Sequence, residues 1–474
     1  KIFPAILFNS GFVLFTFISS SGFAQIVDPN DRLLSRDQAV EEYTILYKSL
    51  INYHPEPFMY IDRASLEKYF TEKKDHFTEE ISIKDLHLEV RKLITQIKCG
   101  HTYAKPSEEW YQRIEKNLWL LPFTVYIETD KAYIKSTVKG DFDFKVKDEI
   151  ISINEVPIDD ILSRMRAIQQ RDGNIKGFVE SKIERIFRFY YLFLYGMPDE
   201  VEVTFISEGQ IKETKVKLSG SRLLAEKDFD LALSLEARLE NKWSTFAIDK
   251  NRKTGYLKIK RVSDRKEYKD YYKSVFRLMK DENIDRLILD LRNNGGGFFG
   301  NGNTLLTYLC EDEFDYNFGR SKTETEKNKY VKRDFFNRIT KFAFAIKPKK
   351  NKLKDYKQYN FSYKPNEYYF GGKLDVLING GTFSQASLIS AKLNEEGATF
   401  FGEETGGTES GTNAMVSSKL TLPYSGIQVN IPYYRVITYS PHAQLGRGIL
   451  PDVELPANKY NATTDTQLEY LLTH

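Results

Sequence analysis

The second half of the chain alternates short apolar segments with amphipathic ones, and this alternation constrains its fold more than any other feature. Residues 254–259, 286–291 and 374–379 are apolar segments of strand length. Residues 268–281 and 385–396 follow two of them and have helical periodicity. Strands that alternate with helices form parallel sheets with helices on their faces. We therefore predict a mostly parallel α/β sheet from about residue 244.

Two other regions precede this sheet. Residues 36–97 have apolar positions at three- and four-residue steps, which predicts helices. Residues 116–220 contain alternating segments that predict strands. A chain of 474 residues exceeds what one core usually organises. The predicted domains are a helical domain at 25–113, a mixed α+β module at 114–222, and an α/β domain at 223–474 with an insertion near 311–370.

One string in the middle module resembles the core of a PDZ domain. Residues 146–157 read Val-Lys-Asp-Glu-Ile-Ile-Ser-Ile-Asn-Glu-Val-Pro. The usual PDZ form has a Gly-Asp pair, a short apolar strand and then Asn-Gly, and here Lys147 and Glu155 replace the two glycines. The resemblance implies a module that binds an extended peptide by adding it to a sheet edge. The alternative is a plain insert of mixed sheet and helix.

The first residues have the pattern of a secretory signal peptide. Lys1 is followed by an apolar stretch and then by small residues up to Ala24. Polar residues and Pro4 interrupt the stretch, which favours cleavage after Ala24 over an uncleaved membrane anchor. The sequence thus predicts a signal peptide at 1–24 and an exported protein, periplasmic or secreted, in the bacterial style. No stable membrane span is expected after cleavage.

Charge and cysteine content exclude several classes of function. The net charge is +3, from 69 basic and 66 acidic residues, which argues against nucleic-acid binding. No His or Cys cluster has the spacing of a zinc site, so we expect no metal. Cys99 and Cys310 either pair in an oxidising compartment or are two small buried apolar side chains.

Two polar segments follow predicted strands of the α/β domain. The first is Asp290-Leu291-Arg292-Asn293-Asn294-Gly295-Gly296-Gly297, in which glycines let backbone N–H groups approach a ligand closely. The second is Asn379-Gly380-Gly381-Thr382-Phe383-Ser384-Gln385-Ala386-Ser387, in which a serine begins a helix. Taken singly, the first fits a tight turn and the second fits a helix cap.

In this order, the two segments resemble the C-terminal processing, or tail-specific, peptidase family, which includes the tricorn protease. The resemblance covers about residues 245–456 and closes at Gly448-Ile449-Leu450-Pro451-Asp452. It implies a catalytic domain of crotonase- and Clp-like architecture and a serine peptidase without a cofactor. Ser384 matches the nucleophile. The backbone N–H groups of Gly296 or Gly297 and of Gln385 match the oxyanion donors.

The resemblance gives two choices for the base that activates the serine. One branch of the family uses a lysine in Gly-Lys-Gly, but no lysine occurs from Leu393 to Ser418. The tricorn-like branch uses a histidine far upstream, in a His-Thr sequence, and this chain has Gly100-His101-Thr102 in that place. A neutral imidazole can accept the serine proton near neutral pH. We therefore predict His101 as the base.

The carboxylate that would orient His101 has three candidates. Glu409 stands where the other branch has its lysine and is our choice, and Glu403 and Glu404 compete with it.

Three functions compete at this stage. The first is a serine endopeptidase or carboxyl-terminal processing peptidase that hydrolyses a polypeptide through an acyl-enzyme. The second is a non-catalytic peptide- or lipid-binding protein of the same fold, in which His101 and Ser384 would lie too far apart for a hydrogen bond. The third is an acyl-CoA enzyme, which the export signal argues against.

Overall fold

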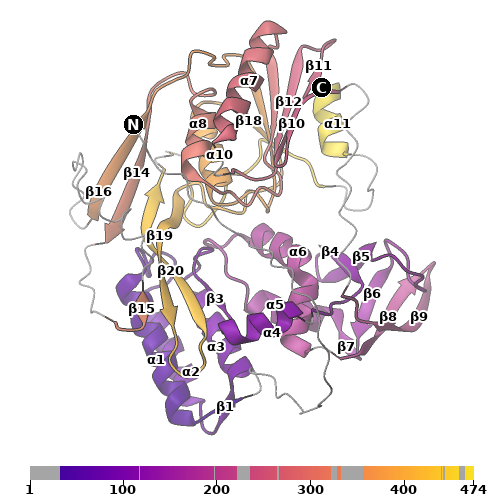
Figure 1. The fold of residues 1–474 in the computed structure, drawn as a ribbon, viewed down its shortest axis with the longest axis vertical. Helices are drawn as coiled ribbons and strands as arrows, with labels where there is room; N and C mark the ends of the chain where they lie inside the picture. The colour runs from indigo at the N-terminus through magenta and orange to yellow at the C-terminus, as the bar shows by residue number, and fades with distance from the viewer. Residues whose placement is uncertain are drawn as a thin grey trace, which may run out of the picture.

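A computed structural model describes most of the chain after the first residues (Figure 1). The described residues are 32–116, 118–196, 198–220, 235–263, 266–321, 328–332, 356–438, 440, 443–457 and 465–474. The predicted signal peptide at 1–24 and much of the predicted insertion near 311–370 lie outside them. The predicted domain boundaries stay predictions.

A seven-stranded sheet forms the centre of the largest domain, in the order β10-β11-β12-β13-β17-β18-β21. The pairs from β12 to β21 are parallel, whereas β10 and β11 are antiparallel additions at one edge. The mostly parallel α/β sheet expected from the alternating pattern is confirmed. Its strands are β10 (Glu236–Asn241), β11 (Ser244–Asp249), β12 (Thr254–Ile259), β13 (Arg286–Asp290), β17 (Lys373–Ile378), β18 (Thr399–Gly402) and β21 (Val453–Glu454).

Helices cover both faces of this sheet because successive side chains of a strand point to opposite sides. Leu287 and Leu289 of β13 belong to the large core under three helices, whereas Ile288 between them belongs to the core under the last helix. The three helices are α7 (Glu267–Asp281), α8 (Phe299–Leu306) and α10 (Gln385–Glu395), and the last is α11 (Thr466–Thr473).

A second sheet connects the α/β domain to the N-terminal helices. Its order is β15-β19-β20-β14-β16, and β3 (Tyr103–Lys105) pairs with β20. Leu420, Val429 and Ile431 of its two long central strands complete the core of the N-terminal helices, which therefore do not fold around a core of their own. The strands are β14 (Phe314–Ser321), β15 (Val331–Lys332), β16 (Tyr356–Tyr363), β19 (Gly411–Thr421) and β20 (Gln428–Ile437). The preceding elements are β1 (Leu33–Leu34), α1 (Arg36–Tyr53), α2 (Arg63–Asp75), β2 (Ile81–Ser82), α3 (Ile83–Gln96) and α4 (Glu108–Lys116).

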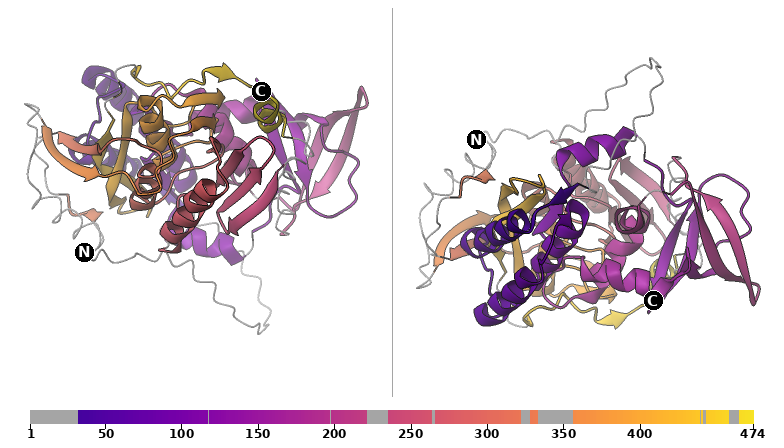
Figure 2. Two further views of the ribbon diagram at one scale, coloured as in Figure 1. Left: turned by 90° about the horizontal axis from the view of Figure 1, so that it is seen from above. Right: turned by 90° about the horizontal axis from the view of Figure 1, so that it is seen from below.

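The middle module is a separate sheet with two helices and its own core. Figure 2 shows from above and from below that this sheet lies at one end of the molecule, while β14 and β16 lie at the other. Lys147 and Glu155, which replace the expected glycines, both have positive φ angles, 84° and 62°, so the backbone keeps the conformation that glycine would favour. The elements are β4 (Phe123–Glu128), β5 (Lys131–Thr137), β6 (Glu149–Ile153), β7 (Val156–Pro157), α5 (Ile158–Ala167), α6 (Lys176–Tyr195), β8 (Glu200–Ser207) and β9 (Gln210–Lys217).

The sequence left open whether the two cysteines pair, and it predicted no stable membrane span after cleavage. Cys99 and Cys310 are both buried free thiols, so they do not pair. Among the helices that the structure describes, none combines the length and the apolar character that crossing a bilayer requires.

Candidate active site

Ser384 lies at a strained turn between β17 and α10. Its φ and ψ angles are 58° and −122°, a left-handed conformation that costs a residue other than glycine on the order of 1–3 kcal/mol. Its side chain makes no capping hydrogen bond to the helix. The helix-cap interpretation of Ser384 is therefore wrong. The turn instead holds the hydroxyl clear of the helix, as a nucleophile at the end of a strand requires.

The two glycine-rich segments are fastened to each other at the carboxyl ends of β13 and β17. The Phe383 N–H donates to the Asn294 carbonyl at 2.9 Å, and the Thr382 hydroxyl donates to the Leu291 carbonyl at 2.8 Å. The Asn379 side chain accepts the Asn293 N–H at 2.9 Å. These bonds join residues that are distant in sequence and fix the conformation of the strained turn.

Gly296 lies directly against the serine turn. A Cβ atom at this position would be 2.7 Å from the Gln385 nitrogen and 2.8 Å from the Ser384 Cβ, so only glycine fits. The Gly296 N–H donates to the Asn294 side chain at 2.9 Å and is therefore occupied. Among the described residues, the N–H groups of Gly297 and Gln385 have no hydrogen-bond acceptor. Gln385 directly follows Ser384 in the chain, and Gly297 directly follows Gly296, which packs against the serine turn.

His101 reaches Ser384 from the N-terminal region, across 283 residues of sequence. It lies between α3 and β3, and the pairing of β3 with β20 brings it to the α/β domain. The Asn430 side chain donates to the His101 carbonyl at 2.9 Å, and the ring stacks on Phe383 at 4.7 Å between centroids. The His101 Nε2 atom is 3.0 Å from the Ser384 Oγ atom.

The other nitrogen of His101 connects to a buried acid through one hydroxyl. His101 Nδ1 is 3.1 Å from Thr412 Oγ1, and the Thr412 hydroxyl donates to Asp172 Oδ2 at 3.2 Å. The second oxygen of Asp172 accepts the Gly100 N–H at 2.6 Å. Both Thr412 and Asp172 are 3% exposed. The carboxylate thus holds both the backbone next to His101 and the hydroxyl that faces its ring.

Burial and charge act in opposite directions on this pair. Burial lowers the pKa of His101, while the nearby Asp172 carboxylate raises it, and burial has the larger effect. Burial raises the pKa of Asp172, and the charge of His101 and the hydrogen bonds from Gly100 and Thr412 oppose that rise. A histidine with a lowered pKa is neutral at neutral pH, which is the state that accepts a proton.

The structure does not bring Glu409 to His101, so our choice of orienting carboxylate is corrected. Its Oε1 atom instead accepts hydrogen bonds from Asn394 at 2.8 Å and from Ser440 at 2.6 Å. The competing acids also have other partners: Glu404 binds Arg447 at 2.8 Å, and Glu403 accepts the Ala457 N–H. We chose Glu409 because of its spacing from Ser384 in the sequence, but that spacing does not determine the direction in which its side chain points.

Sequence reasoning missed Asp172 and Thr412. Asp172 lies in the polar run Gln169-Gln170-Arg171-Asp172-Gly173-Asn174, which has the composition of an exposed turn. Thr412 is one of several threonines near the start of β19. Asp172 lies in the connection between α5 and α6 of the middle module, and this module packs on the serine turn. The position of the module on that turn is set by tertiary contacts, so the sequence alone does not show it.

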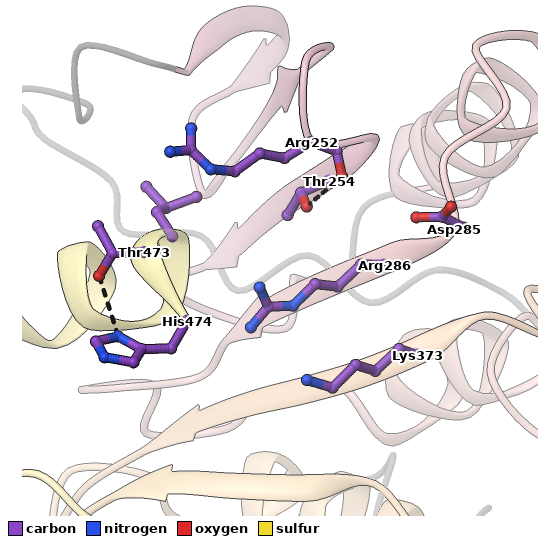
Figure 3. Close-up of a pocket in the computed structure, with 8 residues that line it drawn as sticks. Arg252, Thr254, Asp285, Arg286, Lys373, Thr473 and His474 are labelled. Carbon is purple, nitrogen blue, oxygen red and sulfur yellow. Dashed lines mark hydrogen bonds between the residues drawn. The ribbon is translucent and has the colours of Figure 1, made fainter.

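Two cavities lie away from the Ser384 hydroxyl. One of about 500 Å³ is lined by Arg252, Arg286 and Lys373 at the amino ends of β12, β13 and β17 (Figure 3). The glycine-rich segments follow the carboxyl ends of β13 and β17, so this cavity is at the opposite edge of the sheet. Its Arg286 and Lys373 both pair with Asp375. A second cavity of about 460 Å³ lies beside the Asp172 loop, where Asn174 and Leu445 line it.

Comparisons with known proteins agree with the expected family. Residues 253–455 match the model of peptidase family S41, and residues 117–224 match that of a PDZ domain. No curated protein sequence matches the chain.

Two solved structures of CPAF share the fold at low sequence identity. Mature CPAF has a TM-score of 0.63 at 14% identity, over 92% of this chain and 96% of its own. Mature CPAF complexed with lactacystin has a TM-score of 0.66 at 15% identity, over 92% and 97%. The photosystem II D1 C-terminal processing protease has a TM-score of 0.44 at 13% identity, over 88% and 93%.

Proposed function

This chain joins a serine peptidase domain of family S41 to a PDZ domain, and we propose that it hydrolyses peptide bonds with Ser384 as nucleophile and His101 as general base. The observation that carries the assignment of these two residues is the 3.0 Å distance between His101 Nε2 and Ser384 Oγ. The competing binding-protein hypothesis required the two side chains to lie too far apart for a hydrogen bond, and that requirement is not met.

We propose Asp172, through Thr412, in place of Glu409 as the group that orients His101. A threonine hydroxyl has one proton, and here it is donated to the Asp172 carboxylate. The Thr412 oxygen can then only accept from His101 Nδ1, which places the ring proton on Nδ1. Nε2 is left with its lone pair directed at the Ser384 hydroxyl, as a general base requires.

The reaction follows from this arrangement. Ser384 Oγ attacks the carbonyl carbon of the scissile bond while His101 Nε2 accepts the serine proton. The N–H groups of Gly297 and Gln385 are free to stabilise the oxyanion, whereas that of Gly296 is occupied by Asn294. His101 then donates its proton to the leaving amine, and a water molecule, activated by His101, hydrolyses the acyl-enzyme. No step requires a metal or an organic cofactor.

The proposal also covers the cellular compartment in which the protein acts and the way it cleaves its substrate. The pattern at residues 1–24 supports export to the periplasm or the outside of the cell. The PDZ domain supports recognition of an extended polypeptide at a sheet edge, as expected of an endopeptidase or a carboxyl-terminal processing peptidase.

Labelling with a fluorophosphonate serine probe tests the assignment. We expect the mature chain to be labelled and both Ser384→Ala and His101→Ala to remain unlabelled, with unchanged unfolding temperatures. Labelling that survives in His101→Ala would require another base. A folded parent chain without labelling would contradict the catalytic role of Ser384.

A further inference from the structure

Helix α6 of the PDZ segment presents one face to the catalytic loops. A Cβ atom on Gly177 would be 3.4 Å from the Gly380 Cα, and Phe178 stacks on Phe383 at 4.3 Å between centroids. One turn later, Ser181 Oγ lies 3.0 Å from where a Cβ of Gly381 would be. Positions four residues apart lie on the same side of a helix, so Lys182 and Arg185 continue this face.

Arg185 extends from this face to the loop that carries the proposed oxyanion donor. Its Nη1 atom lies 3.9 Å from where a Cβ of Gly295 would be, two residues before Gly297. Arg185, Gly295 and Gly297 are all exposed. The guanidinium group is therefore open to a ligand that lies along the loop from Gly295 to Gly297.

Lys182 and Arg185 have no acidic partner in the described part of the chain. The two acids of the same helix are engaged elsewhere: Glu180 pairs with Arg166 at 2.7 Å, and Glu184 accepts the Ile127 N–H at 2.8 Å. Burial, together with the charges of Arg185 and Arg91, lowers the pKa of the partly buried Lys182 to about 8. Burying a cation without a counter-charge costs free energy, which an anionic ligand would recover.

We propose that Lys182 and Arg185 form an anion-binding subsite beside the oxyanion loop, which binds a carboxylate of the polypeptide substrate within a few residues of the scissile bond. The inference rests on the proposed peptidase function. The planar guanidinium of Arg185 suits a carboxylate, which it can bind through two parallel hydrogen bonds, while Lys182 adds a second positive charge from the next position on the face. The carboxylate comes either from an aspartate or glutamate side chain or from the free end of the chain.

Cleavage of a degenerate synthetic decapeptide pool, followed by mass spectrometry of the products, tests the subsite. The pool is made twice, with free carboxyl ends and with amidated ends. An enrichment of Asp and Glu at one position relative to the cut in both pools assigns a side-chain carboxylate. Cleavage at a fixed distance from the end in the free-acid pool alone assigns the terminal carboxylate. Either result supports the subsite if the double variant Lys182→Met, Arg185→Gln reduces the enrichment, or the cleavage at that fixed distance, by about fivefold or more.

Two further variants test whether the carboxylate preference depends on the charges at positions 182 and 185. Lys215→Met removes a positive charge from exposed β9 of the same module and should leave the preference unchanged. Arg185→Glu should exchange the acidic preference for a basic one. A carboxylate preference of either kind that persists in the double variant, or the absence of both kinds from the parent, overturns the subsite. If the parent is labelled by fluorophosphonate, the peptidase assignment survives that result; if it is neither labelled nor active, both proposals fail together.

Discussion

The peptidase segment and the PDZ segment contribute different parts of the candidate active site. Residues 253–455 carry Ser384, the candidate oxyanion donors and Thr412. Residues 117–224 carry Asp172, the buried acid that Thr412 connects to His101. Glu409 belongs to the peptidase segment but binds Asn394 and Ser440. The segment that contains Ser384 therefore does not supply the acid that is linked to His101.

This difference teaches that the PDZ segment is part of the candidate site and is not merely attached to it. Ile175 and Phe178, at the start of α6, form a small core with Phe383, the residue before Ser384. The Gly100 N–H, beside the base, bonds to Asp172. A change in the PDZ segment should therefore affect catalysis when it faces these contacts and should affect only stability when it does not.

The largest effect is expected for Asp172→Asn. The asparagine amide would donate to Thr412, which could then donate to His101 Nδ1 and place the ring proton on the wrong nitrogen. We expect kcat/KM to fall on the order of 100- to 1000-fold. Initial rates of peptide cleavage measure this loss, and the unfolding temperature is the control for folding. A loss below about threefold would remove Asp172 from the mechanism.

The pH dependence separates a catalytic effect of Asp172 from a structural one. Because burial lowers the pKa of His101 from its usual 6.5, the parent should lose activity with a midpoint below pH 6.5 as the imidazole becomes protonated. The Asp172 charge raises that pKa, so Asp172→Asn should move the midpoint to still lower pH. A lower rate with an unmoved midpoint in the pH profile of kcat/KM would indicate misfolding of the loop instead.

Thr412→Val should have the next largest effect. Valine has the same shape but lacks the hydroxyl, so His101 Nδ1 and Asp172 Oδ2 both lose a partner. We expect a loss of activity of roughly 10- to 100-fold, since a hydrogen bond to a charged group contributes about 1.5–3 kcal/mol. Thr412→Ser retains the hydroxyl and should restore most of the rate of fluorophosphonate labelling. Equal losses in the valine and serine variants would argue against the hydroxyl as the link.

Glu409→Gln should alter stability more than activity. Glutamine can still accept from Asn394 and Ser440, but the loss of charge weakens these bonds by about 1–2 kcal/mol in the free energy of unfolding. Because Glu409 has no contact with His101 among the described residues, kcat/KM should stay within about threefold of the parent. Urea unfolding and peptide cleavage on the same preparations compare the two quantities. A loss of activity comparable to that of Asp172→Asn would restore Glu409 as the orienting acid.

The sequence predicted the family, the parallel sheet and the PDZ domain, because these depend on local patterns and on ordered motifs. It also singled out Ser384 and His101, which the structure places within hydrogen-bond distance. It did not single out Asp172, because nothing in the run from Gln169 to Asn174 indicates a loop that is buried between segments. The loop is bonded to Lys98, Gly100 and Gly446, which are distant in the sequence, and such packing has no local sequence pattern.

The smallest effect is expected at the far side of the PDZ segment. Glu155 has a φ angle of 62° in the turn before β7, and the neighbouring Asn154 bonds to Glu202 of β8 and not to a catalytic loop. Glu155→Gly should raise the free energy of unfolding by about 0.5–1 kcal/mol, because glycine adopts this conformation without the clash of a Cβ atom. Glu155→Ala is the matched control, since it removes the charge but keeps the Cβ. Urea unfolding should show a higher free energy of unfolding for the glycine variant alone, and kcat/KM should be unchanged in both variants. A change in kcat/KM would mean that the whole module, and not only its α6 face and the Asp172 loop, is coupled to Ser384.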